Sequence, residues 1–336
     1  MGFVWLGKPP PATLLAVPNY WGWPVHGLKK LIAMHEDIAG EMLTGILEKK
    51  PTSSQRSKVV RWLAERHDDW KRQSWGILSL GRVQDVENQI GRLAVHEVMD
   101  CPPYGELLIQ GFESIAVRHP EYHLVRDLAL MHTLFRSAQH DANLQKPDRQ
   151  TSMAPISAST VLLNLGGTEL IQSLARMVIL ACFNLLEAFV SGLATSWVME
   201  HPNATPDQLR QLHDNTQSLR KRLLKTVRFV TDRSDLLDEQ KPPFALLFGE
   251  LKCMRDAFVH CEPGETPTKW GYVKEELFHD VPVASVEKAV DCTEAIICEV
   301  WKALTGRERP TWFPRRSQEG EFPRMPVRLA VIGVAP

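Results

Sequence analysis

The feature that most constrains this chain is a mostly apolar stretch from Met177 to Met199. It is long enough to cross a bilayer or to form the central helix of a folded core. Asn184 and Glu187 lie near its middle, and a carboxylate at the centre of a bilayer costs roughly 2.5–3.5 kcal/mol. We therefore expect a buried helix of a soluble protein, with a membrane-anchored protein as the alternative.

The composition indicates a folded protein of about two domains. Of 336 residues, 44% are hydrophobic and 24% are charged, which excludes intrinsic disorder. Lys plus Arg number 39 and Asp plus Glu number 40, which excludes a globally basic nucleic-acid binder but leaves room for a local basic patch. Six cysteines without a C-x-x-C pair indicate reduced thiols and a cytoplasmic protein.

Helical periodicity and helix-boundary residues predict an all-α fold. Residues 1–150 are expected to form an N-terminal helical region of unknown role, including helices near 52–70, 82–99, 104–118 and 121–140. The polar segment 151–167 is expected to be a linker. Residues 168–306 are expected to form an up-and-down bundle of four helices, the first capped by Thr168. Its other helices are expected at 206–233, after Pro243 and at 283–305, and residues 307–336 form an irregular tail.

Sequence motifs of common enzymes are absent. The chain has no G-x-x-x-x-G-K-[ST], no H-E-x-x-H and no G-x-S-x-G. Cys253, His260 and Cys261, and the His279-Asp280 pair, match no standard zinc spacing, so we expect no metal and no cofactor.

The chemically most informative residues are Arg255, Asp256 and His260, at the end of the third bundle helix. A guanidinium can clamp phosphate oxygens, and a histidine can transfer a proton near neutral pH. This pair is sufficient to cleave RNA through its own 2′-hydroxyl without a metal. The alternative is structural: an arginine in a local salt bridge with Asp256, and a histidine placed favourably at a helix C-terminus.

This segment resembles the HEPN family of helical-bundle domains, whose ribonucleases carry Arg, a polar residue and, after a short gap, His. The run from Asn184 to Val190, with its single acidic residue Glu187, is similar to a helix of that family, and the resemblance covers about 165–306. It implies that His260 is a general acid or base, that Arg255 binds the scissile phosphate and that Asp256 orients one of them. Glu187 is a further candidate, with an internal ion pair as its alternative role. The family also implies a homodimer with a composite site.

RNA requires a basic path, and the second bundle helix offers one. Five of its residues are expected to bind RNA: Arg220, Lys221, Arg222, Lys225 and Arg228. A solvated helix face is the alternative. The basic and aromatic residues at 307–316 suit a single strand, but equally suit packing on a partner or on the N-terminal region.

These observations predict a cytoplasmic, metal-independent endoribonuclease that acts as a homodimer. The family implies a toxin or an antiviral defence effector, with a regulatory or antitoxin protein as a further partner. The alternative is a non-catalytic helical scaffold or binding module for RNA, nucleotide or a partner protein.

Overall fold

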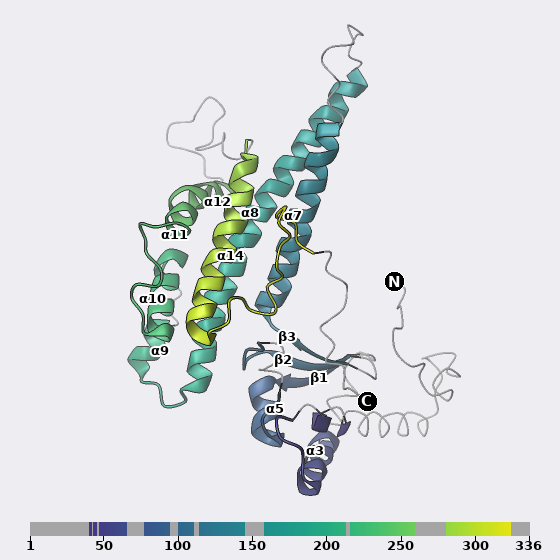
Figure 1. Ribbon diagram of the computed structural model, residues 1–336, viewed down its shortest axis with the longest axis vertical. Helices are drawn as coiled ribbons and strands as arrows, with labels where there is room; N and C mark the ends of the chain where they lie inside the picture. Colours follow the sequence, from purple (N-terminus) through teal and green to yellow (C-terminus); the bar gives the residue numbers. More distant parts are fainter. Residues whose placement is uncertain are drawn as a thin grey trace, which may run out of the picture. The chain divides into compact units, whose positions relative to one another are not determined.

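A computed structural model describes most of the chain between Gly40 and Pro323, in two compact units. The sheet unit comprises Met1–His119 with Val327–Pro336, and the helical unit comprises Pro120–Pro326. The described residues are 40–41, 43–45, 47–65, 77–94, 100–110, 114–144, 158–212, 216–259 and 280–323. Most of them are helical, and a small antiparallel sheet is present as well (Figure 1).

The sheet unit contains three antiparallel strands in the order β1-β2-β3. Its elements are α3 (Ser53–Glu65), β1 (Ile77–Arg82), α5 (Val83–Ile90), β2 (Glu106–Gln110) and β3 (Ser114–Arg118). Leu107 on β2 pairs with Val117 on β3, and both are buried together with apolar side chains of α3 and α5. One small core therefore joins the sheet to these two helices.

The all-α expectation is wrong for the sheet unit, because residues 106–118 form two strands where a helix was expected. Periodicity alone cannot separate a short buried strand from a short buried helix. The expected helix near 52–70 is present as α3, and its start shows the reciprocal cap of a helix N-terminus. Thr52 N donates to Gln55 Oε1 at 2.9 Å, and Gln55 N donates to Thr52 Oγ1 at 3.2 Å.

The helical unit is built around α8 (Ala158–Glu200), which packs against α7, α10, α12 and α14. The other elements are α7 (Pro120–Leu144), α9 (Pro206–Leu212), α10 (Leu219–Thr231), α11 (Phe244–Leu246), the π-helical turn η1 (Leu247–Leu251), α12 (Lys252–Val259) and α14 (Val283–Thr305). Figure 1 shows α7 and α14 running alongside α8, with α10 to α12 beyond α14. Apolar side chains from all of these layers share one core.

The apolar stretch of the sequence lies in α8. By length and composition, Thr168–Glu200 is the one candidate membrane span found in the described part of the chain. In this structure 61% of its most apolar window is buried inside the protein. A helix that is apolar on all sides needs such cover from its neighbours, and α8 receives it on several sides.

The chain divides at His119 and Pro120, whereas the sequence suggested a linker at 151–167. The reason is that α7 packs along α8 and buries Val125, Leu128 and Phe135 in the same core. Residues 158–167 belong to α8, so this helix begins before its expected cap at Thr168, and 145–157 lie outside the described residues.

The remaining helices of the bundle follow the expectation closely. The helix expected at 283–305 is α14, and the first bundle helix, α8, ends at Glu200. The helix expected at 206–233 is divided into α9 and α10, and the one after Pro243 contains the turn η1. Residues 307–323, which we call the C-terminal strap, have no regular structure, but Trp312, Phe313 and Phe322 are buried in the helical core.

Candidate functional site

The rotation of α12 is fixed by the π-helical turn that precedes it. Leu247, Phe248 and Leu251 of η1 are buried. The ring of Phe248 lies edge-on to Phe183 of α8, with the ring centres 6.2 Å apart, and this contact holds the turn against α8. A π turn adds a residue to the helical repeat, which changes the direction in which the following side chains point. On α12 these side chains include Lys252, Arg255 and Asp256.

Arg255 and Asp256 meet Glu187 of α8 in one cluster of charges. Arg255 Nη1 donates to Asp256 Oδ1 at 3.1 Å, and its Nη2 lies 3.8 Å from Glu187 Oε1. Lys252, one turn earlier on α12, donates to the other oxygen of Asp256. We call Glu187, Lys252, Arg255 and Asp256 the α8–α12 cluster; it balances two cations against two carboxylates.

The α8–α12 cluster is only partly open to solvent. The side chains of Arg255 and Asp256 are each 26% exposed, and those of Lys252 and Glu187 are more open. Burial raises the pKa of the Asp256 carboxyl, but the hydrogen bonds from Lys252 and Arg255 together with their charges lower it by more, so this pKa lies below its ordinary value. Asp256 is therefore a carboxylate at neutral pH, and it holds both cations.

Of the four expected catalytic residues, the structure brings three together: Glu187, Arg255 and Asp256. His260 lies outside the described residues. Sequence reasoning missed Lys252, although its spacing of four residues from Asp256 on a helix is a signal for an ion pair. Among the described residues, no group of three or more His, Cys, Asp or Glu side chains could hold a metal ion.

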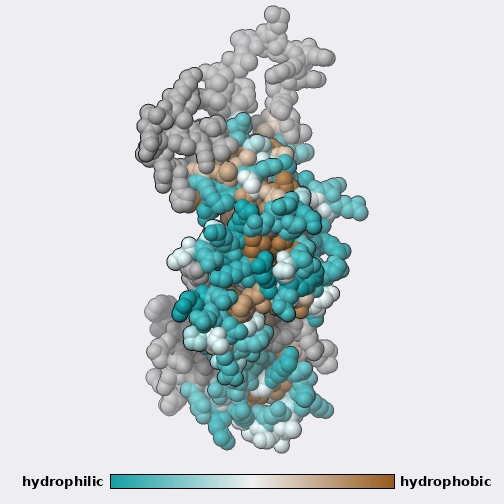
Figure 2. All heavy atoms as spheres, turned by 90° about the vertical axis from the view of Figure 1, so that its left-hand side faces the viewer, coloured by the Kyte–Doolittle hydropathy of each residue, from teal (hydrophilic) through white to brown (hydrophobic). Residues whose placement is uncertain are grey.

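The five expected RNA-binding residues lie on α10 but differ in their contacts. Arg220 Nη2 donates to Glu239 Oε2 at 2.9 Å, so this arginine already has an acidic partner. Arg222 Nη2 donates to Ser191 Oγ of α8 at 2.8 Å. Lys221, Lys225 and Arg228 form no ion pair or hydrogen bond within the described part of the chain. The face seen in Figure 2 is mostly hydrophilic, with smaller hydrophobic areas.

Arg222 and Arg255 lie against the same side of α8. Ser191, which Arg222 contacts, and Glu187, which Arg255 contacts, are four residues apart on this helix, which places them on one face with about 6 Å of rise between them. The guanidinium groups of Arg222 and Arg255 therefore contact the same side of α8, at positions one helical turn apart.

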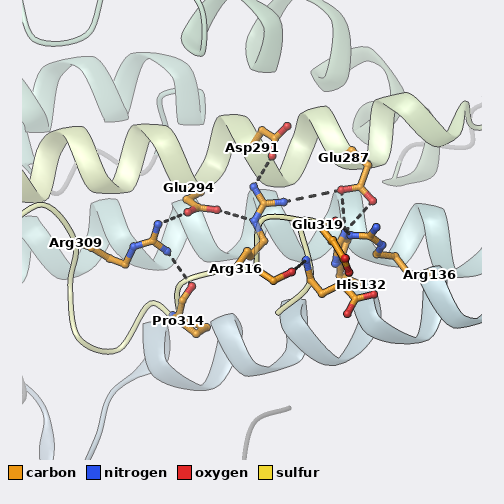
Figure 3. A network of polar contacts seen from close by, with 11 residues as sticks. His132, Arg136, Glu287, Asp291, Glu294, Arg309, Pro314, Arg316 and Glu319 are labelled. Atoms are coloured by element: carbon orange, nitrogen blue, oxygen red, sulfur yellow. Dashed lines mark hydrogen bonds and ion pairs between the residues drawn. The ribbon is translucent and has the colours of Figure 1, made fainter. Parts of the chain in front are cut away.

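The arginines of the C-terminal strap are engaged within the helical unit. Arg316 Nε donates to Glu294 Oε2 at 2.7 Å, and Arg316 also contacts Asp291 and Glu287 of α14 (Figure 3). Arg309 donates to Glu294 and, at 2.9 Å, to the carbonyl oxygen of Pro314. The tail thus packs on α14, which was not among the surfaces expected from the sequence, and also on α7, which lies within the expected N-terminal region 1–150.

A buried histidine completes this network. His132 of α7 is fully buried, and its Nε2 lies 3.1 Å from both carboxylate oxygens of Glu287 (Figure 3). Arg136, one turn further along α7, donates to the carbonyl oxygen of Glu319 in the strap at 2.6 Å. The strap is therefore bound to both α7 and α14.

Comparison of the chain with protein-family models, curated proteins and solved structures gives no match. The α8–α12 cluster and the cations of α10 are the charged groups of the helical unit that the expected function would use. Such an arrangement can bind an anion: a phosphate oxygen can replace a carboxylate on Arg255, and Lys221, Lys225 and Arg228 of α10, which pair with no described carboxylate, attract a polyanion.

Proposed function

We propose that the helical unit is a metal-independent endoribonuclease of the HEPN type. The observation that carries the proposal is the meeting of Arg255 and Asp256 on α12 with Glu187 on α8. These residues are three of the four that the resemblance selects; the fourth is His260. The protein would act in the cytoplasm as a homodimer, as a toxin or an antiviral defence effector, under the control of a regulatory or antitoxin protein.

In the proposed reaction, the 2′-oxygen of a ribose attacks the adjacent phosphorus. A base removes the proton of the 2′-hydroxyl, the bond from phosphorus to the 5′-oxygen breaks, and an acid protonates that oxygen. The products are a 2′,3′-cyclic phosphate and a free 5′-hydroxyl. His260 would transfer protons, and Arg255 would bind the charge that develops on the phosphate. Asp256, kept ionised by Lys252 and Arg255, would hold Arg255 in place.

A second candidate function is a non-catalytic helical module that binds RNA, nucleotide or a partner protein. The observation that favours it is that Arg255 already contacts two carboxylates, Asp256 and Glu187. In this alternative the α8–α12 cluster fastens α12 to α8, and the cations of α10 supply the binding surface.

RNA cleavage in EDTA separates the two functions. Wild-type protein should release fragments with cyclic phosphate ends, and His260→Ala or Arg255→Ala should each slow cleavage by about 10²-fold or more. His140→Ala removes an exposed histidine of α7 and should cleave like wild type. Equal cleavage by wild type and His260→Ala would contradict the nuclease. Absence of cleavage by wild type under activating conditions would favour the binding module.

A further inference from the structure

Arg222 differs from its neighbouring arginines in the group that it contacts. Between residues 216 and 259, three other arginines contact a described carboxylate: Arg220, Arg233 and Arg255. Arg222 contacts the hydroxyl of Ser191 at 2.8 Å instead. A neutral acceptor orients the guanidinium without neutralising its charge, so Arg222 keeps its attraction for an anion.

The Ser191 hydroxyl adds a second kind of donor at the same point. Its oxygen accepts from Arg222, which leaves its single O–H group to donate. Thr195 bonds to the carbonyl oxygen of Ser191 at 2.8 Å and does not compete for the hydroxyl. Several N–H groups of a fixed guanidinium next to one O–H group form a binding site suited to a phosphate.

The positive charge continues along α10 beside this pair. Lys225 follows Arg222 by three residues and therefore lies next to it on the helix surface. Lys221 is exposed, and neither lysine pairs with a carboxylate among the described residues. An anion at Ser191 and Arg222 would thus have further cations beside it, as a polyanion requires.

We propose that Ser191 and Arg222 form a second phosphate subsite, which binds the phosphate next to the scissile one on a single RNA strand. This inference rests on the proposed function, because Arg255 defines the first subsite. Glu187, which pairs with Arg255, and Ser191, which accepts from Arg222, lie one turn of α8 apart, about 6 Å of rise. Consecutive phosphates of an extended single strand have a comparable spacing, and basic grooves that bind single strands follow the backbone in this way.

The first test measures binding without cleavage. A labelled 2′-O-methyl RNA lacks the attacking hydroxyl, so its binding to the full chain can be followed by fluorescence anisotropy at several salt concentrations. Arg222→Ala should weaken binding about 5- to 10-fold and reduce the slope of log K against log salt by about 0.7. Ser191→Ala should weaken binding about 2- to 5-fold. Arg210→Ala removes the same charge from an exposed residue of α9 and should change binding less than about twofold.

The second test locates the phosphate. Neutral methylphosphonate linkages are placed one at a time along the same RNA. A methylphosphonate beside the mapped cleavage position should weaken binding to wild type. It should not further weaken binding to Arg222→Ala, because that variant has already lost the contact between Arg222 and the phosphate. An Arg222→Ala protein with unchanged affinity and salt slope, or with full sensitivity to that linkage, would overturn the subsite.

The two proposals can fail separately. If wild type does not cleave RNA, the nuclease proposal fails. The claim that the subsite binds the phosphate next to a scissile one then fails with it. The loss of affinity in Arg222→Ala but not in Arg210→Ala would still establish Ser191 and Arg222 as a phosphate site. If wild type cleaves RNA and Arg222→Ala binds normally, the nuclease stands and the subsite is wrong.

Discussion

At the scale of single residues, the two carboxylate contacts of Arg255 differ in how readily a phosphate would replace them. Its hydrogen bond to Asp256 is 3.1 Å long, whereas the 3.8 Å separation from Glu187 is that of an ion pair without a hydrogen bond. Glu187 is also the more exposed of the two carboxylates, so its attraction is more strongly screened by water. We infer that an incoming phosphate displaces Glu187 and leaves Asp256 in place.

The same contacts make Asp256 a stabilising residue. Asp256→Asn leaves Lys252 and Arg255 without their shared carboxylate and should lower the free energy of unfolding at pH 7 by about 1 kcal/mol. Because the folded-state pKa of Asp256 lies below its ordinary value of 3.8, its contribution is complete above that value. The contribution is lost as the pH falls through the lowered pKa.

Urea denaturation of wild type and Asp256→Asn at pH 7, 5, 4 and 3 measures this difference. The gap should stay constant between pH 7 and 5 and close at lower pH. Asp207→Asn is the matched control, because Asp207 is highly exposed and lies 3.7 Å from Arg210. A gap that does not depend on pH would show that the charge of Asp256 is not what stabilises α12.

At the scale of elements, the sequence predicted most of the helical unit and missed the sheet. Long periodic segments such as 283–305 were predicted with correct ends, because a proline and a glycine flank that helix. Residues 104–118 were misassigned because their few apolar residues fit a short helix as well as two strands. The close approach of Gly105 to Val117 exists only once the sheet has formed, so no local pattern could reveal it.

Gly105 therefore tests the sheet directly. In Gly105→Ala the new Cβ would lie 2.6 Å from Val117 Cγ1 and 3.0 Å from the carbonyl oxygen of Pro102. We expect a loss of about 1–3 kcal/mol in the stability of the sheet unit, measured by thermal or urea denaturation. In Gly40→Ala, in the same unit, the Cβ meets Val60 at an ordinary 3.6 Å and should cost much less. Equal stability of the two variants would contradict the packing of β3 beside Gly105.

At the scale of the whole molecule, the strap shows how distant residues decide the role of a basic segment. The sequence of 307–316 fits RNA binding because it is basic and aromatic. Its partners are three acidic residues on one side of α14, Glu287, Asp291 and Glu294, spaced by four and three residues. The spacing of these three acidic residues was visible in the sequence. Their pairing with the arginines of the strap depends on the path of the chain after α14, which periodicity does not predict.

Arg316 is the centre of this pairing, and its loss should loosen the strap. Arg316 is 12% exposed and contacts all three acidic residues, so Arg316→Ala leaves them close together without their cation. We expect the stability of the helical unit to fall by about 2–3 kcal/mol at pH 7. Arg315→Ala, which removes an exposed neighbouring arginine, should have little effect.

The pH dependence of the stability lost in Arg316→Ala identifies the cause of that loss. Burial raises the pKa of Glu287, but its hydrogen bond with His132 and the charges of His132, Arg136 and Arg316 lower it by more, so the pKa lies below the ordinary 4.5. The stabilising contribution of this carboxylate is therefore complete above about pH 4.5 and is lost as the pH falls through the lowered pKa.

The deficit of Arg316→Ala should shrink over the same range, because protonated carboxyl groups no longer repel one another. Urea denaturation at pH 7, 5, 4 and 3, followed by tryptophan fluorescence, reports on the strap because Trp312 lies against Trp301 of α14. A deficit that persists unchanged down to pH 3 would mean that Arg316 stabilises the strap by packing, for example against the ring of Phe322, and not by its charge.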